Sequence, residues 1–359
     1  MNILFLHITQ GFSGVEKRFF HYYQYLNDLN DNNYTFLCSK TFLKRHNLSF
    51  VPSNNNKILL YGIYWNKSSK YTRYIDYVLL VIKLIRLSIN KYDMAHFPTT
   101  GSRLFIHFIR AKCKSISVVN SNNSELIREI SHPIFYNCLK SGVLVDCLDE
   151  NIQKVISQKF PKFKKQLYVS PCSFINYKGR CIESGQKEHA ICFAGRLIEM
   201  KGIDMLVNQM KNILEKTSYN IYILGQGDYR EKIIGIKKEF DKHDRIFIDF
   251  VLDPINIMEK TEVFLSLQKS ENYPSQSLLE AMAAENVIIA TNVGLTTKIV
   301  KKQFGYLIND GIELLEKLIF LDNNPSVITS MGKCARHFVI ANHNVEKYHN
   351  YLLSFCSND

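Results

Sequence analysis

The stretch VFLSLQKSENYPSQSLLEAMAAENVIIATNVGLTTKIV, residues 263–300, decides the fold class of this chain. Its first five residues form an apolar run that predicts a buried strand, and a polar loop that holds Glu271 follows. Residues 278–284 are strong helix formers, and the apolar run 287–290 predicts a second strand. The stretch therefore predicts a strand, a loop, a helix and a strand, which is the repeating unit of α/β proteins.

The same alternation runs through the rest of the chain. Strands are predicted at residues 3–8, 34–38, 57–61, 92–96, 115–120 and 166–170, and again at 189–194, 220–224, 246–250 and 304–308. Residues 255–260 are predicted to continue the second sheet. With 359 residues, 46% of them apolar, the chain can bury two cores. We predict two Rossmann-like domains, the first at residues 1–176, with a polar linker within residues 176–189.

The positive charge is concentrated in the first half of the chain. Residues 1–180 hold 25 Lys and Arg against 10 Asp and Glu, a net charge of +15, whereas residues 181–359 have a net charge of −3. No Arg-rich recognition helix or aromatic RNA-binding signature accompanies this charge, so we predict no nucleic-acid partner. We favour an anionic membrane surface or a lipid-linked phosphate over simple solvation.

Two segments of the basic half each leave two interpretations open. The run KFPKFKK, residues 159–165, is either a solvated face or a contact for anionic lipid. Residues 71–90 predict one long helix with an apolar face and with Lys, Arg and Tyr at its rim. That pattern suits either an interfacial helix or a crossover helix packed on the sheet.

Cysteine content and hydropathy indicate the compartment. Nine cysteines without a Cys-x-x-Cys pair fit reduced thiols better than a disulfide framework or a zinc site. The N-terminus has no positive n-region of a signal peptide, and no window reaches the roughly 18 apolar residues of a membrane span. We therefore expect a cytoplasmic protein.

Charged residues follow two strands of the second half, where open α/β sheets bind their ligands. Arg196 and Lys201 suit a diphosphate, since arginine offers a planar fork and lysine a mobile point charge. The carboxylates of Glu271 and Glu280 suit vicinal hydroxyls of a ribose and a sugar ring. Two simpler interpretations remain: the cations are solvated loop charges, and Glu280 only completes a capping box that starts at Ser277.

The first half offers weaker candidates. Gly14, after the first strand, either lets the backbone approach a phosphate or serves a tight turn. His96 ends a strand and is either a site residue or a structural hydrogen-bonding group. Asn120 and the polar residues 121–124 either bind sugar hydroxyls or cap the helix that opens at Glu125.

Six segments of the second half occur in a recognisable order: GRLIEMKG (195–202), LGQG (224–227), ENYPSQSLLEAMA (271–283), IIATNVG (288–294), MGKCAR (331–336) and NVEKY (344–348). Together they resemble the motifs of the retaining glycosyltransferases of family 4. The first half resembles this family only in outline, through SGVE (13–16) and YDMAH (92–96). The resemblance implies a GT-B fold: two Rossmann-like domains facing across a cleft, the second at residues 177–336, and a C-terminal helix, 337–359, that returns to the first domain.

The resemblance also implies roles for individual residues. Arg196 and Lys201 would bind the donor diphosphate, Glu271 the donor sugar and Glu280 the ribose. Acceptor-side positions would include His96 and Asn120, which stands where the family usually has a histidine. Eight residues separate the two glutamates instead of the family's seven, and we expect a bulge before the helix to absorb the extra one. The other implied donor-binding residues are Gly14, Gly195, Gly227, Phe250, Val251, Asn272, Tyr273, Ser277 and Leu278.

The predicted activity is the retaining transfer of a hexose or N-acetylhexosamine from a UDP-sugar, or second a GDP-sugar, to a lipid-linked glycan in O-antigen or capsule synthesis. We expect no cofactor and no metal, since no Asp-x-Asp pair is present to hold one. The expected location is the inner face of the plasma membrane, as a peripheral protein. Two alternatives stay open: a non-catalytic subunit that binds a nucleotide sugar and a partner enzyme, and a sugar-nucleotide epimerase on the same fold.

Overall fold

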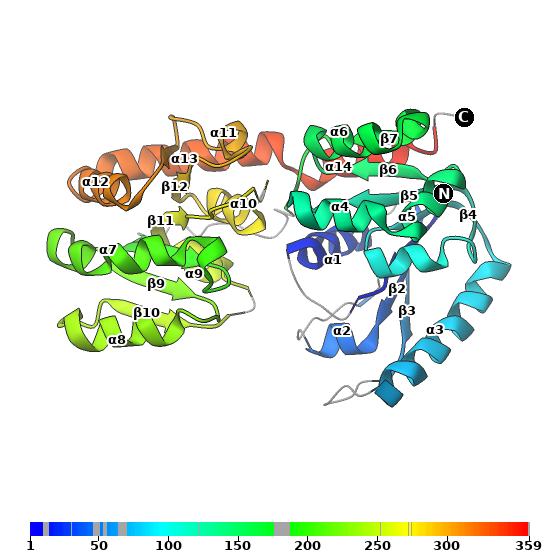
Figure 1. Ribbon diagram of the computed structural model, residues 1–359, viewed down its shortest axis with the longest axis horizontal. Helices are drawn as coiled ribbons and strands as arrows, with labels where there is room; N and C mark the ends of the chain where they lie inside the picture. Colours follow the sequence, from blue (N-terminus) through cyan, green and yellow to red (C-terminus); the bar gives the residue numbers. More distant parts are fainter. Residues whose placement is uncertain are drawn as a thin grey trace. The chain divides into compact units, whose positions relative to one another are not determined.

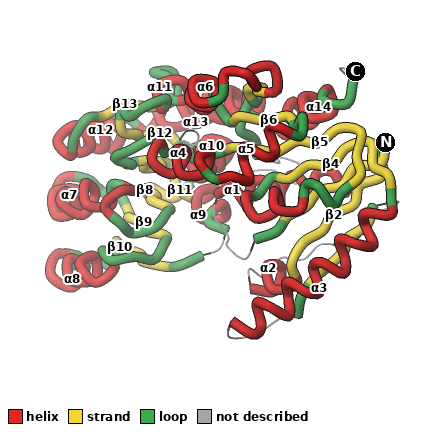
Figure 2. The backbone as a smooth tube through the Cα atoms, turned by 45° about the vertical axis from the view of Figure 1, so that its right-hand side comes forward, coloured by secondary structure: helices red, strands yellow, loops and turns green. Residues whose placement is uncertain are grey.

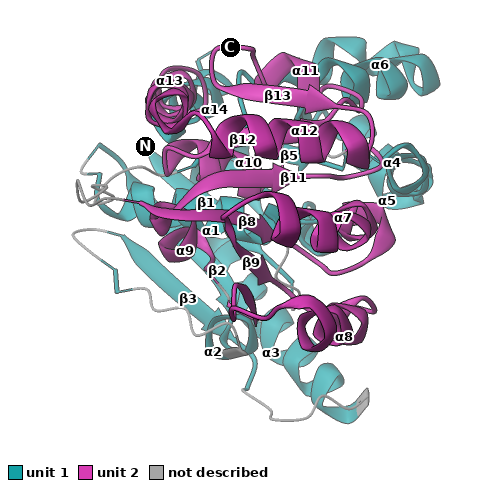
Figure 3. Ribbon diagram, turned by 90° about the vertical axis from the view of Figure 1, so that its left-hand side faces the viewer, with its two compact units in different colours: residues 1–176, 345–359 teal, residues 177–344 magenta. Residues whose placement is uncertain are grey.

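The computed structural model describes residues 1–9, 14–29, 31–45, 51–52, 56–63, 70–120, 122–175, 187–251, 253–271, 273 and 275–357. The chain divides into two compact units (Figure 3): unit 1 is Met1–Asn176 together with Val345–Asp359, and unit 2 is Tyr177–Asn344. We predicted a returning segment that starts at residue 337. In the structure the preceding helix runs without a break to Asn342, so residues 337–344 belong to unit 2.

Unit 1 contains a seven-stranded sheet in the order β3-β2-β1-β4-β5-β6-β7, and each neighbouring pair is parallel. The strand order reverses between β1 and β4, as in Rossmann-type sheets. The strands are β1 (Asn2–His7), β2 (Asn33–Ser39), β3 (Lys57–Tyr61), β4 (Lys91–Phe97), β5 (Arg110–Val118), β6 (Leu144–Cys147) and β7 (Leu167–Val169).

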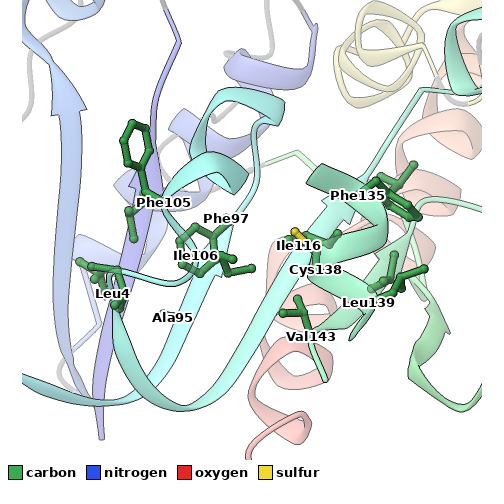
Figure 4. Packing of buried hydrophobic residues seen from close by; sticks show 14 of the residues in the cluster. Leu4, Ala95, Phe97, Phe105, Ile106, Ile116, Phe135, Cys138, Leu139 and Val143 are labelled. Atoms are coloured by element: carbon green, nitrogen blue, oxygen red, sulfur yellow. The ribbon is translucent and has the colours of Figure 1, made fainter. Parts of the chain in front are cut away.

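Helices cover both faces of this sheet because its strands are apolar on both sides. In β1, Leu4 and Leu6 join one buried cluster, whereas Ile3 and Phe5 join another. The first cluster packs under α3, α4, α5 and α6, and Figure 4 shows part of it; the second packs under α1 and α14. The helices of unit 1 are α1 (Gly14–Asn27), α2 (Lys40–Arg45), α3 (Lys70–Ile89), η1 (Thr100–Phe105), α4 (Asn123–Ser131), α5 (Pro133–Lys140), α6 (Glu150–Lys159), η2 (Pro161–Gln166) and α14 (Val345–Ser354).

Unit 2 contains a six-stranded parallel sheet in the order β10-β9-β8-β11-β12-β13. Its strands are β8 (Glu188–Ala194), β9 (Asn220–Leu224), β10 (Ile246–Asp249), β11 (Thr261–Ser266), β12 (Val287–Thr291) and β13 (Gly305–Ile308). The helices between and after them (Figure 1) are η3 (Glu199–Lys201), α7 (Ile203–Lys216), α8 (Arg230–Phe240), α9 (Ile255–Lys260), α10 (Gln276–Ala283), α11 (Thr296–Ile299), α12 (Gly311–Asp322) and α13 (Pro325–Asn342). Helix α7 packs beside α8 and α12, and α10 packs beside α9 and α13. The prediction of two Rossmann-like sheets is confirmed.

Some local predictions were wrong or incomplete. Residues 255–260, which we expected to continue the second sheet, form helix α9, because a six-residue segment with only three apolar residues fits either state and this one contains the helix formers Met258 and Glu259. The elements α5, β6, α6 and α12 were not predicted. In the run 159–165 the rings of Phe160 and Phe163 pack against the core of unit 1, while its four lysines are exposed.

The last helix is fastened to unit 1 by buried polar groups. Asp146 is fully buried, and its carboxylate accepts hydrogen bonds from the hydroxyls of Ser117 (2.8 Å), Tyr348 (2.9 Å) and Tyr351 (3.1 Å). His349 Nδ1 lies 2.9 Å from the hydroxyl of Tyr22. Helix α14 is thus part of the core of unit 1 although about 200 residues separate it from β6. No helix in the described part of the chain is long and apolar enough to cross a membrane.

Candidate active site

The candidate site of unit 2 lies at the carboxyl ends of β8 and β11. These strands are neighbours, and the strand order reverses between them: β9 and β10 lie on one side, and β12 and β13 on the other. Chains that leave two such strands diverge to opposite faces of the sheet and leave room for a ligand between their loops. The loop after β8 carries Arg196 and Lys201, and the loop after β11 carries Glu271.

Backbone hydrogen bonds hold the loop after β8 against the loop after β9. Gly195 N donates to Leu224 O at 2.9 Å, and Leu197 N donates to Gln226 O at 2.8 Å. Between these two anchors the side chain of Arg196 is exposed. Lys201, at the end of η3, is half-buried, and both burial and the nearby charge of Arg196 lower its pKa. Two cations placed this close to each other are suited to one ligand that carries several negative charges.

The loop after β8 also contacts the end of β11 directly. Gly202 has a φ of 73°, and a Cβ atom there would lie only 1.6 Å from the carbonyl oxygen of Leu267, so no other residue fits. Lys269 reinforces this contact: its Nζ lies 2.8 Å from Glu199 Oε1 and 2.7 Å from Asp204 Oδ2. Its backbone N–H donates to Met200 O at 3.1 Å. Residues on both sides of Lys201 therefore contact the loop that carries Glu271, and these contacts fix the position of the segment.

Replacing Lys269 by methionine is expected to weaken nucleotide binding about threefold to tenfold, because the η3 segment loses both carboxylate contacts and Lys201 shifts. The melting temperature should change little, since Lys269 is 37% exposed and its partner Glu199 is 67% exposed. Isothermal titration with UDP and a thermal melt measure the two effects. The matched control is Lys211→Met, which removes an exposed pair with Glu215 on α7. Equal UDP affinity in both variants would show that Lys269 does not position the site.

Glu271 connects the loops after β11 and β12. Its Oε2 accepts a hydrogen bond from Leu295 N at 2.8 Å. Gly294 has a φ of 52°, and a Cβ there would lie 1.7 Å from the same oxygen. Thr291 Oγ1 also donates to Gln268 O at 2.6 Å. The position of the Glu271 carboxylate is therefore set by the backbone of the next loop, as well as by its own strand.

Helix α10 follows this loop and begins at Gln276, with Ser275 at its N-cap. Ser277 and Leu278 thus lie in the first turn, whose backbone N–H groups have no partner within the helix. Ser277 is not the N-cap, so the interpretation of Glu280 as part of a capping box is wrong. Glu280 is only 2% exposed and belongs to the buried side of the helix. The extra residue between the two glutamates was expected at residues 274–277, of which 274 lies outside the described residues.

The remaining predicted donor residues lie around the same edge of the sheet. Phe250 directly follows β10 and is 50% exposed, with Val251 half-buried beside it. Gly227 O accepts from Arg230 N at the start of α8. Tyr273 is half-buried, and Asn272 lies outside the described residues. The predicted residues of unit 2 that the structure describes therefore lie near the ends of neighbouring strands. Their roles in binding the donor stay predictions.

The predicted acceptor-side residues of unit 1 have local partners. His96 is fully buried, with Nδ1 2.8 Å from Ser115 Oγ and Nε2 3.1 Å from Ser117 Oγ, which agrees with its interpretation as a structural hydrogen-bonding group. Asn120 Nδ2 donates to Glu125 Oε2 at 2.8 Å, and the helix there is capped by Asn122. Gly14 begins α1, directly after residues that are not described.

The buried histidines predict acid lability. Burial lowers the pKa of both His7 and His96 from 6.5 to about 3. The unfolded chain then binds protons that the folded chain does not, so stability falls as pH decreases from about 6.5 towards 3. At pH 5 each histidine should cost about 2 kcal/mol. Urea unfolding at pH 7 and pH 5 measures the loss.

His96→Asn should reduce this difference between pH 7 and pH 5 by about half. The matched control is His107→Asn, at an exposed position, which should leave the difference unchanged. An unchanged pH dependence in His96→Asn would contradict the assignment of His96 as a buried neutral group.

Sequence reasoning missed Lys269 and Gly294. Lys269 stands two residues before Glu271 in a polar loop. Nothing in its local sequence pattern shows whether it pairs with carboxylates of another loop or is simply solvated. Gly294 was noted only as the end of a strand, and its contact with Glu271 is not local. No cluster of three or more His, Cys, Asp or Glu side chains suited to a metal ion occurs among the described residues.

Comparison with known proteins shows which family the second half of the chain resembles. Residues 182–358 match the family described as glycosyl transferases group 1. An uncharacterised glycosyltransferase of Methanocaldococcus jannaschii is 25% identical over 251 residues, which are 62% of this chain and 63% of the archaeal protein. The chain thus matches less than two thirds of that relative's length.

Solved structures show the same fold over the whole chain. HepE of Anabaena, solved with UDP and glucose, has a TM-score of 0.69 at 13% identity, covering 99% of both chains. The pneumococcal O-GlcNAc transferase GtfA, solved with UDP and GlcNAc, has a TM-score of 0.67 at 14% identity, covering 100% of this chain and 99% of GtfA. These proteins share the GT-B fold with this chain. Through residues 182–358, just under half of its length, the chain is similar to the family of glycosyl transferases group 1.

Proposed function

We propose that the protein is a retaining glycosyltransferase of family 4 that transfers a hexose or N-acetylhexosamine from a nucleotide diphosphate sugar to a lipid-linked glycan. One observation carries the proposal. The segment with Arg196 and Lys201 is held by direct contacts to the loop with Glu271, at the carboxyl ends of β8 and β11, where the strand order reverses. A UDP-sugar is the favoured donor, since HepE and GtfA were both solved with UDP.

In the proposed reaction the two cations neutralise the leaving diphosphate. Arg196 and Lys201 bind its oxygens, and the first-turn N–H groups of α10 add further donors. Glu271 orients the sugar hydroxyls and Glu280 the ribose, while the base packs at Phe250. The positive side chains supply the charge stabilisation that a divalent ion provides in other transferases, so activity should persist in a chelator.

The chemical step then requires no protein nucleophile. The bond between the anomeric carbon and the diphosphate breaks, and the acceptor oxygen bonds to that carbon from the same face. The acceptor hydroxyl gives its proton to the departing diphosphate oxygen. The product keeps the anomeric configuration of the donor, and the nucleoside diphosphate is released.

The acceptor is proposed to be carried on a polyprenyl diphosphate at the inner face of the plasma membrane, in O-antigen or capsule synthesis. The support is the charge of the first half of the chain: net +15 for residues 1–180. Phosphate and anionic lipid would both be attracted to such a surface.

A donor screen tests the proposed function. Purified protein is melted with UDP-glucose, UDP-GlcNAc, UDP-galactose and GDP-mannose; a bound donor at 100 times its Kd adds about 2.7 kcal/mol. The stabilising donor is then incubated with a polyprenyl-diphosphate glycan and EDTA, and release of nucleoside diphosphate is measured. Stabilisation without release, with any acceptor, would indicate a binding subunit. Formation of an epimer without acceptor would indicate an epimerase.

A further inference from the structure

Helix α3 of unit 1 has two unlike apolar faces. Leu80, Leu84 and Leu87 are at most 3% exposed and pack in the core under the sheet. This confirms the crossover-helix interpretation for one side of the helix. The opposite side is apolar as well and faces solvent: Tyr71, Tyr74, Ile75, Tyr77, Val78, Ile82, Ile85 and Ile89 are between 39% and 83% exposed.

The exposed residues form one continuous stripe. Residues 71, 75, 78, 82, 85 and 89 follow one another at intervals of four and three, which places them along one side of a helix. Figure 2 shows α3 as a straight red helix along the outside of unit 1. A soluble protein rarely exposes an apolar surface of this length, so the stripe indicates a binding surface.

A neighbouring segment extends this surface. Leu104 in η1 is 51% exposed, and Phe108 in the turn that follows is 48% exposed. They flank Phe105, whose ring centroid lies 6.1 Å from that of Tyr77 on α3. The stripe and these two side chains are called the α3 surface below.

The charges around the α3 surface have one sign. Asp76 is the only acidic residue of the helix; it is 6% exposed, and its carboxylate accepts a hydrogen bond from Ile63 N at 2.8 Å. Arg86 is exposed and lies beside the stripe, whereas Arg73, seven residues before Leu80, lies on the leucine side of the helix. Apolar residues bordered by an arginine and tyrosines complement an anionic lipid surface, in which hydrocarbon lies beneath phosphate.

We infer that α3 lies flat in the headgroup layer of an anionic bilayer, with the stripe turned into the acyl boundary and Arg86 at a lipid phosphate. The inference rests on the proposed function, in which the acceptor is lipid-linked, and identifies the surface that brings unit 1 to it. The buried leucines hold the helix to the sheet, so the surface exists before lipid is bound.

Vesicle flotation with the full chain tests this inference. The protein should float with vesicles of phosphatidylcholine and phosphatidylglycerol, and more weakly with phosphatidylcholine alone. The double variant Ile82→Ser and Ile85→Ser should bind more than tenfold more weakly, because two side chains leave the acyl boundary. Arg86→Gln should cost about fivefold on anionic vesicles only. The matched control is Ile312→Ser in unit 2, at a position 66% exposed.

The variants also separate this inference from the proposed function. UDP binding is measured in every variant and should be unchanged, and a urea unfolding curve of each α3 variant shows that unit 1 is folded. Wild-type protein that transfers sugar but does not float, or a double variant that floats as well as the wild type, would overturn the inference and leave the proposed function standing. A wild-type dimer that the double variant converts to monomers, without flotation, would assign the α3 surface to a protein partner instead.

Discussion

Replacing Lys201 by alanine is expected to lower kcat/KM for sugar transfer by about 100-fold to 1000-fold. Lys201 is half-buried and close enough to Arg196 for the two charges to interact, at the ends of the two strands where the sheet order reverses. Its charge would oppose the negative charge that develops on the departing diphosphate. Because that charge grows in the transition state, kcat should fall more than KM rises. Steady-state kinetics with the donor found in the screen measure both constants.

The control for Lys201 must keep the fold and remove a lysine elsewhere. Lys211→Ala serves this purpose, since Lys211 is exposed on α7, where its ammonium lies 3.9 Å from Glu215 and 5.0 Å from the ring centroid of Phe240. It should retain full activity. Lys201→Arg keeps the charge and should recover much of the rate. If Lys201→Ala transfers sugar within threefold of the wild type, the diphosphate is bound elsewhere.

The same lysine gives a pH signature. Burial and the charge of Arg196 lower the pKa of Lys201, so it loses its proton at a lower pH than an ordinary lysine. Transfer should therefore decline on the alkaline side at a pH below the usual range for lysine. In Lys201→Arg this decline should move to higher pH, because arginine stays protonated. An unchanged pH profile would assign the decline to another group.

Replacing Asp146 by alanine should lower the free energy of unfolding of unit 1 by about 3–5 kcal/mol. The change leaves the buried hydroxyls of Ser117, Tyr348 and Tyr351 without their acceptor. It also removes the carboxylate near Arg18, whose guanidinium lies 5.1 Å from the ring centroid of Tyr348. Two of the three hydroxyls belong to α14, so the last helix should detach first. Urea unfolding followed by hydrogen exchange of α14 measures both effects.

Asp146→Asn should cost less than Asp146→Ala. Burial raises the pKa of Asp146, which means that the folded protein disfavours the charge, and an amide keeps an acceptor oxygen. The matched control is Asp93→Ala, which removes a surface pair with Lys112 and should change the stability by less than about 1 kcal/mol. Equal losses in the Asp146 and Asp93 variants would show that the buried network does not hold α14.

Periodicity predicted the sheets well because parallel strands are buried on both faces and appear as continuous apolar runs. Strands β3 and β9 were predicted at their observed bounds. Helix α9 was assigned to the sheet because six residues, three of them apolar, do not distinguish a strand from about one and a half helical turns. His96 was a candidate because strand ends carry ligands, but its burial depends on packing from β5, which no local pattern records.

The sequence alone determined the two α/β units, the family motifs and the placement of Arg196, Lys201 and Glu271 in loops after strands, because strand order along the chain and residue type are local properties. Only the tertiary structure decided that Gly202 seats against Leu267, that Lys269 clamps η3, and that Glu271 is held by the loop after β12. It also decided that α3 keeps a second apolar face in solvent. These features depend on which loops and faces meet, and that is set by the packing of segments far apart in the chain.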